Sequence, residues 1–189
     1  MAQAQIQLFL KANLQMACTQ RELMRLPHRI QFCFLMANGR NSNRGNNMDI
    51  KAFRRSDFEY HTLIEARWRD MDGLRHINHA IYLTYFETAR IQYWAHLGWD
   101  LNEWEAEVGT ILASMKIDYV QQSTYPNTYE IGNRVIRLGN KSFDVFSAIF
   151  EEGNEIPVVT GNFTIVSFDY KTQKTIHVPE IIKTVYNPL

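Results

Sequence analysis

The hydrophobic pattern changes its period twice along the chain, and the first change separates a predicted strand from a predicted helix. Between Phe58 and Arg69, apolar or bulky side chains occupy alternate positions for part of the run, which indicates a strand with one buried face. The alternating positions are Tyr60, Thr62, Ile64, Ala66 and Trp68. The turn signal Asp72-Gly73 follows, so we expect the first strand to end before it.

A period of three to four residues then predicts a single long helix. Asn78 is a suitable N-cap, because its side-chain oxygen can accept a hydrogen bond from a free amide of the first turn. Gly98 supplies the signal that ends the helix. The stripe consists of Tyr82, Tyr85, Phe86, Ala89 and Tyr93. Its aromatic side chains are expected in the core.

Four further segments alternate apolar and polar residues and predict strands, at 111–119, 129–135, 143–149 and 159–165. Turn signals at Pro126, Gly139 and Gly153 separate the four segments by gaps that are typical of an antiparallel meander. One long helix can cover only one face of such a sheet. We therefore expect an α+β fold in which a curved antiparallel sheet wraps around one long central helix. The exposed edges of this sheet favour self-association.

The composition fits one globular domain with an appendage. The chain has 189 residues, of which 46% are hydrophobic and 13% aromatic. Twenty basic residues balance twenty acidic ones, so no net charge draws the chain to nucleic acid or to an anionic membrane. No uninterrupted apolar run reaches the roughly eighteen residues that a membrane span needs. Neither nucleic acid nor a membrane is therefore an expected partner.

Residues 1–47 differ from the rest of the chain. They contain six basic residues and one acid, a net charge of +5, and they end in a linker rich in Asn, Gly and Arg at 37–47. Three explanations stay open: a targeting peptide, an upstream extension that is not natural protein, or a helical accessory element. Both cysteines, Cys18 and Cys33, lie in this segment. The predicted domain at 48–189 thus has no thiol nucleophile, and we expect a cytoplasmic protein, or an organellar one if the segment is a transit peptide.

The candidate chemistry lies at 70–82, between the first strand and the helix. This stretch holds two carboxylates, two imidazoles and the capping Asn. A helix N-terminus offers free amides and positive dipole character to a developing oxyanion, and an ionised Asp72 can attack a carbonyl carbon or activate water. Asp72 is also a common turn residue, and that simpler interpretation stays open. Asp72, His76 and His79 could supply three metal ligands, but no further ligand is clearly placed, so no metal site is expected.

This stretch carries a family resemblance. The residues Asp70-x-Asp72, His76-Ile77-Asn78-His79-Ala80-x-Tyr82 and Tyr85-x-Glu87-x-Ala89-Arg90 resemble the hotdog-fold acyl-CoA thioesterases of the 4-hydroxybenzoyl-CoA thioesterase type. The resemblance extends from about Phe58 to Tyr186 in element order, and its specific part is the start of the helix. Many relatives have Gly where this chain has Arg75, which affects the local turn.

The resemblance implies a role for each matching position. Asp72 matches the catalytic carboxylate, and His79, seven residues later, matches a histidine of related bacterial members. The oxyanion donors would be backbone amides around Asn78, His79 and Ala80. The supporting residues would be Asp70, Tyr82 and Glu87. Lys141 and Ser142 resemble the start of a strand in the family where cationic side chains meet CoA phosphates.

The resulting hypothesis is hydrolysis of an acyl-CoA thioester to the free acid and CoA, with Asp72 as general base or nucleophile. No cofactor is needed, since CoA is part of the substrate, and a homodimer or homotetramer is expected. The main alternative is a non-catalytic protein of the same fold that binds acyl thioesters or assists assembly. A hotdog dehydratase is less consistent, because its Asp and His pattern is missing from the later part of the chain.

Overall fold

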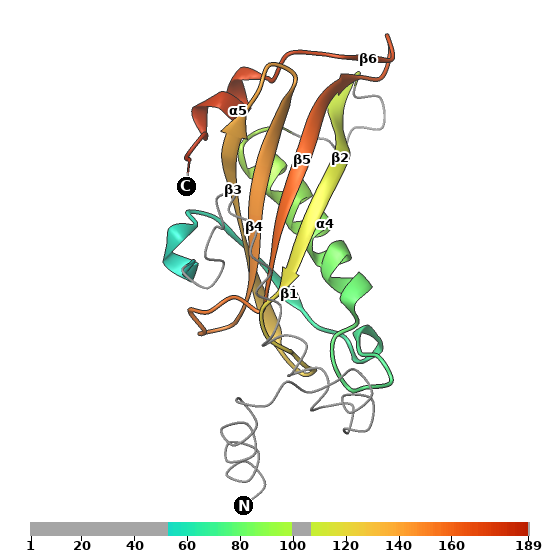
Figure 1. The fold of residues 1–189 in the computed structure, drawn as a ribbon, viewed down its shortest axis with the longest axis vertical. Coiled ribbons are helices and arrows are strands. Elements are labelled where there is room, and N and C mark those ends of the chain that lie inside the picture. The colour runs from blue at the N-terminus through green and yellow to red at the C-terminus, as the bar shows by residue number, and fades with distance from the viewer. Residues whose placement is uncertain (1–52, 100–106, 189) are drawn as a thin grey trace, which may run out of the picture. The chain divides into compact units, whose positions relative to one another are not determined.

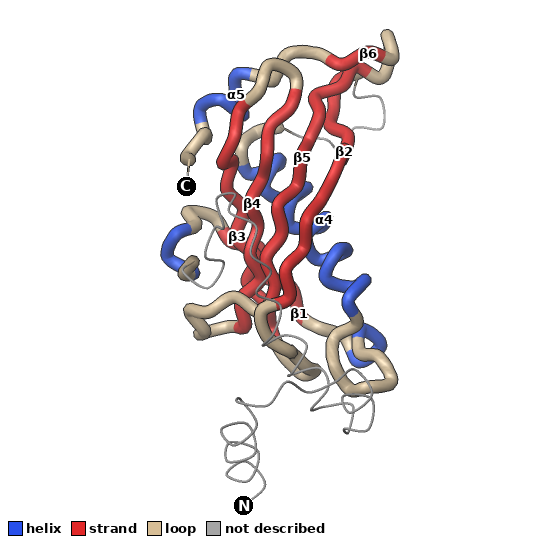
Figure 2. The backbone as a smooth tube through the Cα atoms, viewed as in Figure 1, coloured by secondary structure: helices blue, strands red, loops and turns tan. Residues whose placement is uncertain are grey.

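The computed structural model describes residues 53–99 and 107–188 (Figure 1). Its elements in chain order are η1 (Arg55–Asp57), β1 (His61–Glu65), η2 (Trp68–Asp70), α4 (His79–His96), β2 (Val108–Tyr119), β3 (Thr128–Leu138), β4 (Ser142–Glu151), β5 (Val159–Asp169), β6 (Lys174–Thr175) and α5 (Glu180–Thr184). The strands form one curved antiparallel sheet and α4 crosses one of its faces, as Figure 2 shows. The predicted α+β hotdog architecture is confirmed.

The order of the strands differs from a simple meander. The sheet runs β1-β3-β4-β5-β2, with β6 paired to β5. The predicted hairpins β3-β4 and β4-β5 form, but β2 pairs with β5 over its whole length and not with β3. A period of two shows which residues share a face and does not show which strand is the neighbour. The segment 120–127 carries the chain from the β2 edge back to β3.

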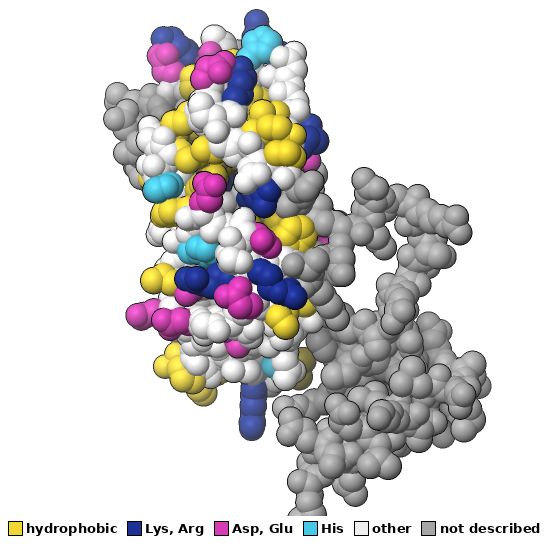
Figure 3. All heavy atoms as spheres, turned by 90° about the vertical axis from the view of Figure 1, so that its left-hand side faces the viewer, with side chains coloured by type: hydrophobic (Ala, Val, Ile, Leu, Met, Phe, Trp, Pro, Cys, Tyr) yellow, Lys and Arg dark blue, Asp and Glu magenta, His cyan; other side chains and the backbone are white. Residues whose placement is uncertain are grey.

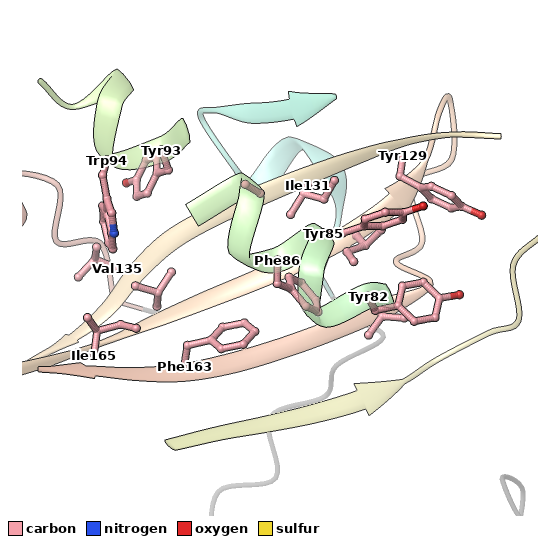
Figure 4. Close-up of a cluster of buried hydrophobic side chains, with 14 of the residues drawn as sticks. Tyr82, Tyr85, Phe86, Tyr93, Trp94, Tyr129, Ile131, Val135, Phe163 and Ile165 are labelled. Carbon is pink, nitrogen blue, oxygen red and sulfur yellow. The ribbon is translucent and has the colours of Figure 1, made fainter. Parts of the chain in front are cut away.

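Helix α4 begins and ends where the sequence predicts. The Asn78 side chain accepts a hydrogen bond from the Ala80 amide at 2.9 Å, and Gly98 adopts a positive φ of 85° after the last turn. Phe86, Ala89 and Trp94 on its inner face are fully buried. Phe86 packs on Phe163 of β5 with 5.1 Å between ring centroids (Figure 4). Burial of each large apolar side chain contributes about 1.5–3 kcal/mol to folding.

A second apolar cluster lies on the opposite face of the sheet. It contains Phe58, Phe146, Ala148 and Phe150. Because side chains alternate along a strand, Phe146 points away from α4 while its neighbour Val145 belongs to the helix-side core. Phe58 packs over Gly132, where a Cβ would clash with its ring. The sheet is thus buried on both faces in this region.

Three details were wrong or absent in the sequence-based prediction. The first strand ends at Glu65, and Trp68 lies in η2 with 73% of its surface exposed, because a short 3-10 turn interrupts the alternation. The short elements β6 and α5 were not predicted.

The proposed extension at 1–47 and the boundary near residue 48 lie outside the described residues and stay predictions.

The surface carries charges of both signs, and the helices bear on whether the chain crosses a membrane. On the face seen in Figure 3, Lys and Arg side chains are interspersed with Asp and Glu side chains. No helix within the two described ranges has both the length and the apolar character that crossing a bilayer requires.

Candidate functional site

The segment between η2 and α4 is a closed loop that ends at the first turn of the helix. The Asn78 amide donates to the Asp70 carbonyl at 2.9 Å, and the Asp72 amide donates to the His76 carbonyl at 2.8 Å. Met71 and Ile77 form an antiparallel bridge between these two contacts. This short ladder connects Asp72 to the start of α4 by main-chain hydrogen bonds. The structure therefore places these two parts of the predicted site next to each other.

Asp72 is half-buried and uses one carboxylate oxygen to hold its own turn. Oδ1 accepts from the Leu74 amide at 2.8 Å and from the His76 amide at 3.4 Å. Within the described ranges, Oδ2 accepts no hydrogen bond. A carboxylate in this arrangement has a fixed orientation and leaves its second oxygen without a donor among the described residues. The turn interpretation and the catalytic interpretation of Asp72 are therefore compatible.

The turn requires a left-handed residue, and that residue is Arg75. Its φ is 66°, in the region that L-amino acids other than Asn and Asp seldom adopt. Gly73 is not among the residues with positive φ and so does not take over this function. This is the position at which the resembling family often has Gly. Arg75 thus adopts a backbone conformation that a glycine takes without strain.

Of the three amides predicted as oxyanion donors, two already have acceptors. The Asn78 amide is bound to the Asp70 carbonyl, and the Ala80 amide is bound to the Asn78 side chain at 2.9 Å. The His79 amide donates to no acceptor in the part of the chain that the structure describes. It is the first amide of α4, where free N–H groups and the helix dipole attract negative charge.

Asp70 is fully buried and connects three parts of the loop base. Its Oδ2 accepts from the Arg67 amide at 2.8 Å and from the Tyr85 hydroxyl at 2.7 Å, and its Oδ1 accepts from the Arg67 guanidinium at 3.0 Å. Burial acts to raise the pKa of Asp70, but the hydrogen bonds from Arg67 and Tyr85 outweigh it and hold this pKa below its ordinary value. Asp70 is therefore ionised near neutral pH and holds Arg67 and Tyr85 together, and its supporting role stays a prediction.

Tyr82 connects the first turn of α4 to the segment 120–127. Its hydroxyl shares a hydrogen bond of 2.6 Å with the hydroxyl of Ser123, and both side chains are buried. The Ser123 carbonyl accepts from the Ile77 amide at 3.0 Å, so the segment 120–127 lies against the closed loop. Burial raises the pKa of Tyr82, which therefore stays a neutral hydroxyl at physiological pH. Figure 4 shows the hydroxyls of Tyr82 and Tyr85 directed toward the end where α4 begins.

The two histidines differ in position. His76 is half-buried in the loop, and His79 is exposed on the first residue of α4. Within residues 53–99 and 107–188, no group of three His, Cys, Asp or Glu side chains is arranged to hold a metal ion. The exposed imidazole of His79 lies at the surface next to the unpaired amide of the same residue, where it can contact a bound ligand or water.

Glu87 lies away from the start of the helix. It is exposed and follows His79 by eight residues, which is roughly 12 Å along the helix axis. Arg90 is buried and lies over the ring of Phe163, with 5.4 Å from Cζ to the ring centroid. No ion pair joins Glu87 and Arg90 among the described contacts, although their spacing of three residues allows one. Within one chain Glu87 does not reach Asp72.

Lys141 and Ser142 lie at the other end of the sheet. Glu65 of β1 pairs with Thr128 at the start of β3, whereas Ser142 begins β4 next to the end of β3. The eleven residues of β3 separate these ends by roughly 30–35 Å. The Lys141 ammonium donates to the Thr175 carbonyl at 3.0 Å. The structure therefore does not bring these residues to Asp72 within one chain.

A shallow groove also lies away from Asp72, near the end of α4. It is lined by Tyr60, Tyr93, His96, Asn133 and Arg134, among others. The groove brings none of the predicted site residues together.

Sequence reasoning missed three residues of the site: Arg67, Tyr85 and Ser123. The spacing of Arg67 and Asp70 by three residues is a signal for an ion pair that a search for local charge pairs can find. Tyr85 belongs to the predicted apolar stripe, and the stripe gives no indication that its hydroxyl reaches Asp70. Ser123 meets Tyr82 across 41 residues of sequence, so no local pattern identifies it.

Comparisons with known proteins identify the family and the fold. No curated protein matches the chain. The PA5185 protein from Pseudomonas aeruginosa is 29% identical with a TM-score of 0.65, and the match covers 70% of this chain and 92% of that one. The DHNA-CoA thioesterase from Staphylococcus aureus is 26% identical with a TM-score of 0.56, covering 62% and 78% of the two chains.

A third similar structure is a thioesterase from Thermus thermophilus in complex with coenzyme A and Zn. It is 25% identical with a TM-score of 0.57, and the match covers 68% of this chain and 97% of that one. The family model described as "Thioesterase-like superfamily" matches residues 66–185, which include the closed loop, α4 and all six strands except β1. Thioester hydrolysis is the general chemistry that these matches support. The chain therefore belongs to the thioesterase-like superfamily.

Proposed function

We propose that this protein hydrolyses acyl-CoA thioesters at the closed loop, with the Asp72 carboxylate as general base or nucleophile and the His79 amide as oxyanion donor. The observation that carries the proposal is the main-chain ladder that joins residues 70–72 to residues 76–78. This ladder holds the Asp72 carboxylate and the unpaired amide of His79 on one short loop. A thioester carbonyl needs these two groups, and a helix N-terminus is a suitable oxyanion donor.

The leaving group simplifies the reaction. A thiolate departs readily, so no strong general acid is required opposite the carboxylate. In the general-base route, Asp72 takes a proton from water, the hydroxide adds to the carbonyl carbon and the thiolate then leaves. In the nucleophilic route, Asp72 forms a mixed anhydride that water cleaves. The His79 side chain would hold the water or donate to the carbonyl.

CoA is the proposed carrier because relatives of this chain are named for it. The Staphylococcus aureus relative is a DHNA-CoA thioesterase and the Thermus thermophilus relative holds coenzyme A. An acyl carrier protein is the second candidate, since it presents the same thioester. The alternative of a non-catalytic acyl-thioester-binding protein predicts binding without release of free thiol.

Self-association along β2 is part of the proposal. This edge strand has twelve residues and exposes Ile111, Leu112 and Met115 by 40–49%. The opposite edge, β1, has five residues. A long apolar edge is a template for a second copy, and two-fold pairing would bring more side chains toward each Asp72. We expect Met115→Lys to shift the protein toward monomer in analytical ultracentrifugation, and an unchanged sedimentation coefficient would contradict this interface.

The central experiment measures thiol release from a panel of acyl-CoA substrates. Asp72→Asn should lower turnover by at least about two orders of magnitude, because the amide cannot act as base or nucleophile. Asp169→Asn is a matched control, since Asp169 Oδ1 also accepts two backbone amides in a turn, at 2.9 and 2.8 Å. This control should keep its turnover. Equal turnover in wild type and Asp72→Asn would exclude the assignment.

A further inference from the structure

Tyr85 and Arg67 each make a side-chain hydrogen bond to Asp70. Tyr85 projects from the second turn of α4, and Arg67 lies directly before η2. Both side chains donate to the buried Asp70 carboxylate, at 2.7 Å and 3.0 Å respectively. Neither makes a hydrogen bond to Asp72 or His79 among the described contacts. Asp70 is therefore the residue through which their hydrogen bonds reach those groups.

Asp70 transmits this restraint in two directions. Along the chain, it lies two residues before Asp72. Across the loop, its carbonyl accepts from the amide of Asn78, the residue before His79, at 2.9 Å. The Asp70 carboxylate is held by Arg67 and Tyr85, and the Asp70 carbonyl holds the other side of the closed loop at Asn78. A shift of Asp70 moves Asp72 and the His79 amide relative to each other.

The charge states of Asp70, Arg67 and Tyr85 favour these hydrogen bonds at physiological pH. Asp70 is fully buried and ionised, and Arg67 supplies the counter-charge from the solvent edge, with half of its side chain exposed. Burial and then the nearby Asp70 raise the pKa of Tyr85, so its hydroxyl stays protonated and donates at physiological pH. A hydrogen bond to a charged acceptor is stronger and more directional than one between neutral groups.

On the basis of the proposed function, we infer that Tyr85 and Arg67 are positioning residues, which act through Asp70 to hold the Asp72 carboxylate opposite the His79 amide. Neither touches the reacting atoms in this assignment. Displacement of a reacting group by about 1 Å can lower turnover about 100-fold.

The test compares Tyr85→Phe with Tyr93→Phe in the full-length protein. Both hydroxyls belong to buried tyrosines of α4, but that of Tyr93 makes no hydrogen bond in the described part of the structure. Tyr85→Phe should lower kcat by about 10- to 100-fold and leave KM within about twofold. Tyr93→Phe should leave both constants within about twofold. Equal losses in the two variants, or a wild-type kcat in Tyr85→Phe, would overturn the positioning role.

Amide hydrogen exchange gives a readout that does not depend on hydrolysis. The Asn78 amide should exchange at least about tenfold faster in Tyr85→Phe than in wild type, while core amides of β4 keep their rates. Arg67→Lys keeps the charge but loses the forked geometry, and should give a smaller change of the same sign. This second variant decides the matter if Tyr85→Phe does not fold. Unchanged Asn78 exchange in both variants contradicts the inference even in the absence of any thioesterase activity, whereas faster exchange without activity contradicts the proposed function alone.

Discussion

The start and the middle of α4 are held by different forces. At the start, the Asp70 carboxylate and carbonyl and the Asn78 side chain make hydrogen bonds of 2.7–3.0 Å to loop and helix. In the middle and in the last turn of the helix, Phe86 and Trp94 are fully buried among apolar side chains, and the Trp94 ring nitrogen makes no hydrogen bond within the described residues. Directional contacts determine the distance between two groups, whereas packing determines mainly how much apolar surface is removed from water.

This difference indicates where function and stability can be separated. A change in the middle of α4 should lower the free energy of unfolding without moving Asp72 relative to the His79 amide. A change at the start should affect the geometry of the loop at a lower cost in stability. The variants below test this separation, from the largest expected effect to the smallest.

Phe86→Ala should give the largest loss of stability. The side chain is fully buried against Phe163, so its removal should lower the free energy of unfolding by about 3–5 kcal/mol. Denaturant unfolding followed by circular dichroism measures this loss. Leu63→Ala, at a side chain that is 64% exposed, should stay within about 0.5 kcal/mol. A folded Phe86→Ala protein that loses turnover at temperatures far below its midpoint would break the separation.

Asp70→Asn should lower the free energy of unfolding by about 1.5–3 kcal/mol at neutral pH, because the hydrogen bonds to a charged acceptor weaken. The pKa of Asp70 in the folded protein lies below its ordinary value of about 3.9. Its contribution is therefore present above the unfolded pKa and is lost as the pH falls through the folded pKa.

The pH dependence of this variant is the sharper measurement. The difference in unfolding free energy between wild type and Asp70→Asn should be constant near neutrality and should shrink as the pH falls below about 3.9. Burial acts to raise the pKa of Asp144, but its contacts with Arg137 lower it below the ordinary value. Asp144 is present in both proteins, so its contribution cancels in the difference between them. A difference that grows toward acid would show that Asp70 is not ionised in the folded protein.

Asn78→Ala should cost about 1 kcal/mol, because the Ala80 amide loses its side-chain acceptor. Asn78→Asp keeps an acceptor at the same position and should retain most of the stability. Thermal unfolding of the three proteins gives the comparison. If Asn78→Ala were as destabilising as Phe86→Ala, packing at the start of α4 would be more important than its hydrogen bonds.

Much of the fold could be predicted because its signals are local. The cap at Asn78, the stripe of α4 and Gly98 define the helix from adjacent residues, and the period of two identifies β3, β4 and β5. The pairing of β2 with β5 could not be predicted, since it joins residues such as Val108 and Asp169 that are far apart in sequence. The short strand β6 has two residues, too few for any periodicity.

In the candidate site, too, the features with local signals could be predicted and the long-range contacts could not. The position of Asp72 beside the start of α4 follows from a short motif, and the structure places them together. The Tyr85 hydroxyl at Asp70 depends on how α4 packs on the sheet, so the sequence pattern indicated only a core residue. Lys141 was grouped with the site by motif, although β3 separates the two ends of the sheet.

Arg75→Gly should give the smallest effect and sharpens the comparison at the level of one backbone angle. Arg75 has a φ of 66°, which costs an L-residue about 1–2 kcal/mol, whereas glycine adopts it freely but loses more chain entropy on folding. The two terms leave a net gain in unfolding free energy of about 0–1 kcal/mol. Arg75→Ala removes the same guanidinium but keeps the Cβ, so it should show no gain. A gain in both variants would attribute the effect to the lost charge, and a loss in Arg75→Gly would mean that the loop needs the Arg75 side chain and not only its backbone conformation.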